Sequence, residues 1–306
     1  MKPVAPADLT SAAGTRSPLI ARLLPKLAMV RDALSRRRRS MLTLATILFV
    51  GGLAWAFRSA GIAIADLAWR WLLAAGALGM VGVILNGVEL SWCARALGKR
   101  VPAGEAIQLS SMGILSNLLP IPGSVLVRGG ALVARGAGMA ESGRVLLFVG
   151  LLRLAVAGAI TGIALLPLTL GIPVIAGSLV ATMVLFALIA RIGGVANALM
   201  LLALRMGMLA TVAVQLLLCF RALGVDAVLR DSALQAIAPV VGSAVGIVPG
   251  GLGVSEAIGA ALAVLISASP ALAFAALALN RMAGYACAFL TVLGFQARDL
   301  AARRSR

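Results

Sequence analysis

The stretch SNLLPIPGSVLVRGGALVARG, residues 116–136, interrupts an apolar segment with two prolines, several glycines and an arginine, Arg128, that has no acidic neighbour. Proline and glycine remove helical hydrogen bonds and permit turns. In a membrane, the backbone groups freed in this way must find partners in protein or water. We therefore predict a re-entrant hairpin that lines a cavity, rather than a simple lipid-facing span.

The composition places this hairpin in a membrane protein. Of the 306 residues, 61% are hydrophobic and 12% are charged, and the mean hydropathy is +1.06. Such values lie far outside the range of soluble globular domains. We expect an all-α polytopic integral membrane protein, because apolar stretches long enough to cross a hydrocarbon core of about 30 Å recur along the chain. About six transmembrane helices are predicted, near residues 41–57, 69–92, 145–167, 172–190, 206–220 and 271–295.

The net charge of +17 is concentrated beside these spans. Nine of the 27 basic residues lie within residues 1–40, and residues 36–39 are four consecutive arginines. Basic clusters beside spans mark the cytoplasmic side and attract anionic lipids. We expect basic cytoplasmic tails at residues 1–40 and 299–306 and a membrane domain at residues 41–298. Nucleic-acid binding is not expected, because aromatic residues do not interleave with the charges to form stacking platforms.

An internal duplication relates the two halves of the membrane domain. CARALG at residues 93–98 matches CFRALG at residues 219–224, 126 positions later. Further matches follow in order at an offset of 127: AIQ at 106–108 with ALQ at 233–235, Ser116 with Ser243, Pro122-Gly123 with Pro249-Gly250, and Val127 with Val254. We expect repeat one to cover about residues 69–167 and repeat two about residues 206–295.

Each repeat therefore contains a broken hairpin, and the second one is VGIVPGGLGVSEAIGA, residues 245–260. The basic loops at 95–105, 135–144 and 191–205 are expected on the cytoplasmic side, and the charge-balanced loop at 221–231 on the other side. The two hairpins then enter from opposite faces. This arrangement is an inverted repeat, on which many alternating-access transporters are built.

The two hairpins carry a family resemblance. PGGLGVSE at residues 249–256 resembles the signature of the membrane domain of lysylphosphatidylglycerol synthases and of related stand-alone, flippase-like membrane proteins. Residues 117–120 and Arg128 resemble the same family's Asn-Leu-Leu-Pro motif with its following arginine. The resemblance covers roughly residues 41–298 and implies a bacterial-type cell membrane. It implies the lipid-translocating half of the synthases without the aminoacyl-transferase domain, for which the chain has no room.

One departure concerns a carboxylate. Where the family often has Gly-Glu three residues before the arginine, this chain has Ser124 and Val125. Any role of that glutamate in the family is therefore missing at this position.

Arg128 is the first candidate site residue. An intramembrane arginine costs about 2.5–3.5 kcal/mol on insertion scales, so a partner or a water-filled cavity must offset it. Its planar fork suits a phosphate or a carboxylate. The alternative is an interfacial anchor, together with Arg135 and Arg144. Asn117 of the resembling motif is a second candidate. Three glycines have backbone amides that could approach an anionic head group: Gly250, Gly251 and Gly253. A tight turn alone would also explain these glycines.

The remaining candidates are intramembrane charges and amides. Glu256 follows the glycine-rich turn and could cap a helix, pair with an arginine or take a proton. Glu89, Arg153, Asn280 and Arg281 lie inside predicted spans, where such residues usually face a bundle interior. Two interpretations of the charged residues remain: a structural ion pair, Glu89–Arg153 or Glu256–Arg281, and a contact with the substrate.

Several functions are excluded or disfavoured by the residues that are missing. The chain has no histidine, no GxxxxGK[ST] motif, and three cysteines without a CxxC pair, so neither P-loop ATP hydrolysis, a metal nor a cofactor is expected. We predict a non-enzymatic protein that translocates an anionic phospholipid or lipid-linked precursor. Two alternatives remain: an integral membrane transferase acting on a lipid-linked substrate, and a membrane subunit that positions a separate lipid- or glycan-modifying enzyme. The transferase is disfavoured by the few acids of the external loops.

Overall fold

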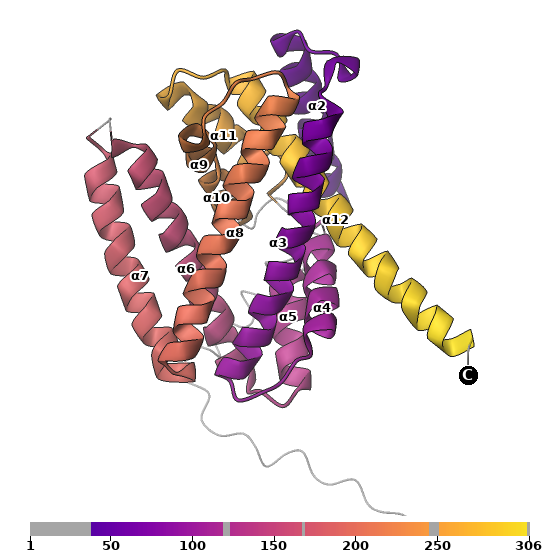
Figure 1. The fold of residues 1–306 in the computed structure, drawn as a ribbon, viewed down its shortest axis with the longest axis vertical. Coiled ribbons are helices and arrows are strands. Elements are labelled where there is room, and N and C mark those ends of the chain that lie inside the picture. Colours follow the sequence, from indigo (N-terminus) through magenta and orange to yellow (C-terminus); the bar gives the residue numbers. More distant parts are fainter. Residues whose placement is uncertain (1–37, 119–122, 167–168, 245–250, 305–306) are drawn as a thin grey trace, which may run out of the picture.

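The computed structural model describes residues 38–118, 123–166, 169–244 and 251–304, and all regular elements in these ranges are helices (Figure 1). The predicted N-terminal tail up to residue 37, both hairpin tips, Gly250 and residues 305–306 lie outside the described residues. The helices are α2 (Arg38–Ala60), η1 (Ile64–Asp66), α3 (Trp69–Ala96), α4 (Ala103–Ser116), α5 (Gly123–Ala134), α6 (Met139–Ala164), α7 (Gly171–Gly193), α8 (Val195–Ala222), α9 (Leu229–Gln235), α10 (Ile237–Ala244), α11 (Val254–Leu265) and α12 (Pro270–Arg304).

Five of these helices, α3, α6, α7, α8 and α12, are long and apolar enough to cross a membrane. They cover the second to sixth predicted spans, and they make the chain a multi-pass membrane protein. The first predicted span falls within α2, whose apolar part, Thr46–Ala60, is shorter.

Helices α3 and α8 run antiparallel through the centre of the bundle (Figure 1). At one end, the amide of Ala68 before α3 donates a hydrogen bond of 3.0 Å to the carbonyl of Ala222 at the end of α8. At the other end, a Cβ atom on Gly193, just before α8, would lie 2.7 Å from the Cα atom of Ala96. We call these the upper and lower ends of the bundle, as they appear in Figure 1.

Two groups of short helices enter the bundle from these opposite ends. Helices α4 and α5 lie in the lower half, and α9, α10 and α11 lie in the upper half (Figure 1). Within each group the chain folds back on itself through a glycine–serine contact. A Cβ atom on Gly113 would lie 3.3 Å from Ser124 Cα, and one on Gly242 would lie 2.9 Å from Ser255 Cα.

The helix starts in the two halves of the chain are related by two nearly constant offsets. Helices α8 and α9 begin 126 residues after α3 and α4, whereas α11 and α12 begin 131 residues after α5 and α6. The offset of 127 implied by the Pro-Gly match and by Val127 with Val254 is therefore wrong beyond the hairpin tips. The tip of repeat two is longer, and at the offset of 131 Ser124 corresponds to Ser255. Each of these serines packs against a glycine of its own hairpin, Gly113 and Gly242.

The predicted loop at 191–205 is also wrong. Helix α7 ends at Gly193 and α8 begins at Val195, so only Gly194 separates them. Gly194 has φ +84°, a left-handed conformation that glycine adopts without steric cost. This reversal places residues 195–205 inside α8, and it takes Arg205 out of the solvent and into the bundle.

Close helix packing in the lower half depends on Gly87 of α3. A Cβ atom there would lie 2.6 Å from the Cα atom of Ile107 on α4, which is backbone and cannot move aside alone. The packing of α4, and with it the position of α5, therefore requires a glycine.

We expect Gly87→Ala to lower the free energy of unfolding by about 1–3 kcal/mol, the usual cost of overpacking. Gly82→Ala is the matched control on the same helix, because its Cβ would meet no atom within 4 Å. Thermal unfolding of the two purified variants in detergent measures the difference. Equal melting temperatures would contradict the close α3–α4 contact.

Candidate functional site

A buried carboxylate, Glu89 of α3, lies at the centre of the first charged cluster. Its side chain is 0% exposed. Nη2 of Arg128, from α5, bonds to its Oε1 atom, and Nε of Arg205, from α8, lies 2.7 Å from its Oε2 atom. Arg128 and Arg205 are 9% and 4% exposed. The antiparallel α3–α8 pair and the returning helix α5 thus bring together three charges that are far apart in the sequence.

A third arginine, Arg153 of α6, belongs to the same cluster. It interacts electrostatically with Glu89 and with Arg205. The predicted Glu89–Arg153 ion pair does not form among the described residues, because Arg128 and Arg205 occupy the carboxylate instead. With one glutamate and three arginines, the cluster carries a net charge of +2.

The cluster also has more hydrogen-bond donors than acceptors. Each guanidinium offers five N–H donors, and one carboxylate offers about four acceptor positions. Within the described residues, Nε of Arg128 is buried and has no hydrogen-bond partner. Surplus positive charge and surplus donors are the requirements for binding an anion such as phosphate.

The cluster lies well inside the bundle. Arg205 is ten residues from the start of α8, so it is about 15 Å from the lower end at a rise of 1.5 Å per residue. Arg128 is in the second turn of α5, counted from the hairpin tip. Its side chain is buried against Glu89 rather than exposed at the lower surface.

A second charged cluster lies on the upper hairpin. Glu256 of α11 is 0% exposed, and Arg281 Nε of α12 lies 2.7 Å from its Oε1 atom. The predicted Glu256–Arg281 pair is therefore confirmed. Glu256 Oε2 also accepts a hydrogen bond of 2.9 Å from the amide of Gly253, and Arg281 donates one of 3.1 Å to the carbonyl of Gly251. The pair is electrically neutral and joins α11, its preceding turn and α12.

The glycines and amides of the prediction have structural contacts. Gly251 and Gly253 have φ +66° and +79° and form the turn before α11. Asn117 directly follows α4, and its Oδ1 atom accepts a hydrogen bond of 2.9 Å from the amide of Ser124 on α5, which connects the two helices of the first hairpin. Asn280 neighbours Arg281, and its Oδ1 atom is buried without a hydrogen-bond partner in the described ranges.

The repeat register shows that the first cluster exists in one half only. With offsets of 126 before the tips and 131 after them, Glu89 corresponds to Gln215, Arg205 to Gly79, Arg128 to Gly259 and Arg153 to Gly284. Two of these counterparts also lie close together, since a Cβ atom on Gly79 would lie 3.1 Å from Gln215 Nε2. The net charge of +2 is thus a property of one site rather than of the fold.

Arg205 is the member of the charged cluster that the sequence prediction missed. The sequence did contain an indication that Arg205 is buried. Residues 195–222 form one apolar run without an internal proline, and a charge inside such a run usually faces the bundle interior. No group of three or more histidine, cysteine or acidic side chains that could hold a metal occurs among the described residues.

In comparisons with protein-family models, with curated proteins and with solved structures, no match to this chain was found.

Proposed function

We propose that this protein translocates an anionic phospholipid or lipid-linked precursor between the two leaflets of a membrane. The observation that carries the proposal is the buried cluster of Arg128, Arg205, Arg153 and Glu89, with its net charge of +2. A buried charge excess is costly unless a counter-ion is present at least transiently. A phosphate passing through the bundle would be that counter-ion.

The two opposed helix groups support a transport role. In a membrane, α4–α5 and α9–α11 would be re-entrant hairpins that reach from opposite faces toward the middle of the bilayer. Opposed broken helices of this kind form the substrate sites of inverted-repeat transporters. The resemblance to the lipid-translocating domain of lysylphosphatidylglycerol synthases favours a lipid over a small anion as the substrate.

The charge distribution supports a cytoplasmic lower end, and the family resemblance favours a bacterial-type cell membrane. Basic residues exceed acidic ones at the lower helix ends, where Arg95, Lys99, Arg100, Arg135, Arg144, Arg191 and Arg298 lie. At the upper end, Arg58, Arg70, Arg221 and Arg230 are nearly balanced by Asp66, Asp226 and Asp231. By the positive-inside rule, α12 then ends in the cytoplasm.

Each residue of the first cluster has a proposed part in translocation. Glu89 holds Arg128 and Arg205 in place while the site is empty. An entering phosphate would accept hydrogen bonds from Arg128, whose Nε atom is free, and Arg153 would add attraction without a fixed ion pair. The acyl chains would remain in the bilayer, so only the head group needs a polar path.

The test is leaflet exchange of fluorescent phosphatidylglycerol in liposomes that contain the purified protein. We expect exchange with wild type, and a rate about tenfold to a hundredfold lower with Arg128→Gln. Charged hydrogen bonds are worth about 1.5–3 kcal/mol, and each 1.4 kcal/mol is about tenfold. The variant should remain folded, because Arg205 still neutralises Glu89.

Arg144→Gln is the control, since Arg144 is exposed near the lower end of α6, and its exchange rate should equal that of wild type. An unchanged rate in folded Arg128→Gln would contradict the proposed head-group contact. Absence of exchange in wild type, with phosphatidylglycerol and with other anionic lipids, would overturn translocation and favour a membrane subunit of a separate enzyme.

A further inference from the structure

A groove lies between α3 and the lower half of α12, on the outside of the bundle and separate from both charged clusters. Its volume is about 310 Å³, and it is lined by Met80, Leu290, Thr291, Gly294, Phe295 and Arg298. This volume is at the small end of the range for ligand pockets, about 300–1,000 Å³. In Figure 1 the lower end of α12 diverges from the other helices.

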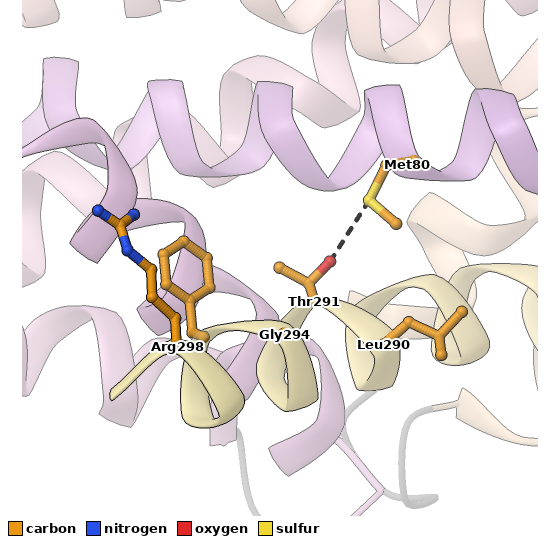
Figure 2. Close-up of a pocket in the computed structure, with 6 residues that line it drawn as sticks. Met80, Leu290, Thr291, Gly294 and Arg298 are labelled. Carbon is orange, nitrogen blue, oxygen red and sulfur yellow. Dashed lines mark hydrogen bonds between the residues drawn. The ribbon is translucent and has the colours of Figure 1, made fainter. Parts of the chain in front are cut away.

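One face of α12 forms the groove wall. Residues 291, 294 and 298 follow each other at helical spacing, so they line a single stripe. Figure 2 shows Met80 of α3 opposite this stripe, in contact with Thr291, whose hydroxyl lies 3.4 Å from the sulfur atom. At Gly294 a Cβ atom would meet no atom within 4 Å, so the floor of the groove is open space rather than packed protein.

Arg298 gives the groove one charged end (Figure 2). Its side chain is exposed, and no ion pair involving it occurs among the described side chains. Glu105, at the start of α4, is paired with Arg135. The groove is therefore apolar along its length and cationic at its lower end.

The order of these residues along α12 matches the two parts of a lipid. Arg298 lies about one turn beyond Gly294 and two turns beyond Thr291, toward the lower end of the helix. The charged residue is therefore nearer the lower end, where a head group would lie, and the apolar wall is nearer the middle of the helix. We propose that the groove binds an anionic phospholipid of the lower leaflet, with one acyl chain between α3 and α12 and its phosphate at Arg298.

The test uses phosphatidylglycerol with a photoreactive diazirine on one acyl chain. A trace of it is added to vesicles of phosphatidylcholine and phosphatidylglycerol that contain the full-length protein. Trypsin cleaves after Arg281 and Arg298, so the groove face of α12 is recovered in one peptide, residues 282–298. We expect this peptide to be labelled more strongly by the phosphatidylglycerol probe than by the matching phosphatidylcholine probe.

Two variants test the two parts of the site. Gly294→Leu should fill the groove and lower labelling by the phosphatidylglycerol probe at least fivefold, and it should fold, because leucine favours helix more than glycine does. Arg298→Gln should lower the same labelling about fivefold, the usual effect of one basic residue at a membrane surface. In that variant the recovered peptide extends to Arg303.

The matched controls lie on α7, outside the groove. Gly177→Leu and Arg191→Gln change an exposed glycine with an open Cβ position and an exposed arginine at the same end of the bundle, and both should leave labelling unchanged. Equal labelling by the two probes, or labelling that survives Gly294→Leu, would show only the ordinary lipid annulus and overturn the proposal. Neither outcome depends on leaflet exchange, so the proposed function is tested separately.

Discussion

Replacing Glu89 by glutamine should cost about 3–5 kcal/mol of stability, the usual effect of removing one partner from a buried ion pair. The side chain is fully buried and is the only acid in contact with Arg128 and Arg205 among the described residues. Without it, three arginines repel one another inside the bundle. Because proteins are stable by only about 5–15 kcal/mol, this cost is a large share of the total stability, so the yield of folded protein should fall, as size-exclusion chromatography in mild detergent would show.

A second substitution should restore part of this loss. Glu89→Gln with Arg205→Gln returns the cluster to a net charge of +2, so we expect more folded protein than with Glu89→Gln alone. Glu105→Gln is the control, because the Glu105–Arg135 pair is about two-fifths exposed, and such pairs contribute about 0–1 kcal/mol. A Glu89→Gln variant as stable as Glu105→Gln would show that water already separates the charges of the cluster.

The helix positions could be predicted because the signals are long and local. Spans such as α7 are apolar runs bounded by turn residues, and the element order of the repeat followed from short matches such as CARALG and CFRALG. The α7–α8 turn was missed because it depends on one glycine, Gly194, where a loop of ordinary length was expected. The register after the tips was wrong because a two-residue match and a single matching valine cannot reveal the extra residues of the second tip.

The candidate site could be predicted only as a set of separate residues. Arg128 and Glu89 were recognisable as charges in apolar surroundings, but their contact joins positions 39 residues apart. Arg205 comes from the other repeat, and only the antiparallel crossing of α3 and α8 brings it to Glu89. Sequence periodicity describes the face of one helix and contains no information on which faces meet.

The two repeats share the contact that closes each hairpin but differ in their buried charges. Both repeats retain the glycine–serine contact that closes each hairpin, at Gly113–Ser124 and Gly242–Ser255. After these serines the sequences diverge, with Val125 in repeat one and Glu256 in repeat two. Repeat one therefore has surplus cations and no hairpin carboxylate, whereas repeat two has a carboxylate with one matching arginine. We infer that the first hairpin binds the ligand and the second is held closed by its own ion pair.

This inference predicts a contrast between single and double variants of the second pair. Glu256→Gln or Arg281→Gln alone should destabilise the protein by about 3–5 kcal/mol, because each leaves a buried charge without its partner. Substituting both should restore at least half of that loss, since two neutral amides remain and the amide oxygen introduced at position 256 can still accept the hydrogen bond from Gly253. Thermal unfolding in detergent measures all three variants.

Leaflet exchange then distinguishes a clamp from a ligand site. If the Glu256–Arg281 pair only holds α11 against α12, the double variant should exchange phosphatidylglycerol at the wild-type rate, while Arg128→Gln does not. A double variant that is folded but inactive would place Glu256 or Arg281 on the lipid path, and it would contradict the assignment of ligand binding to the first hairpin alone. The reason for the expected contrast is the net charge near the site. Removing both members of a neutral pair leaves the electric field that attracts the phosphate almost unchanged. Removing one arginine of the first cluster halves its net charge of +2.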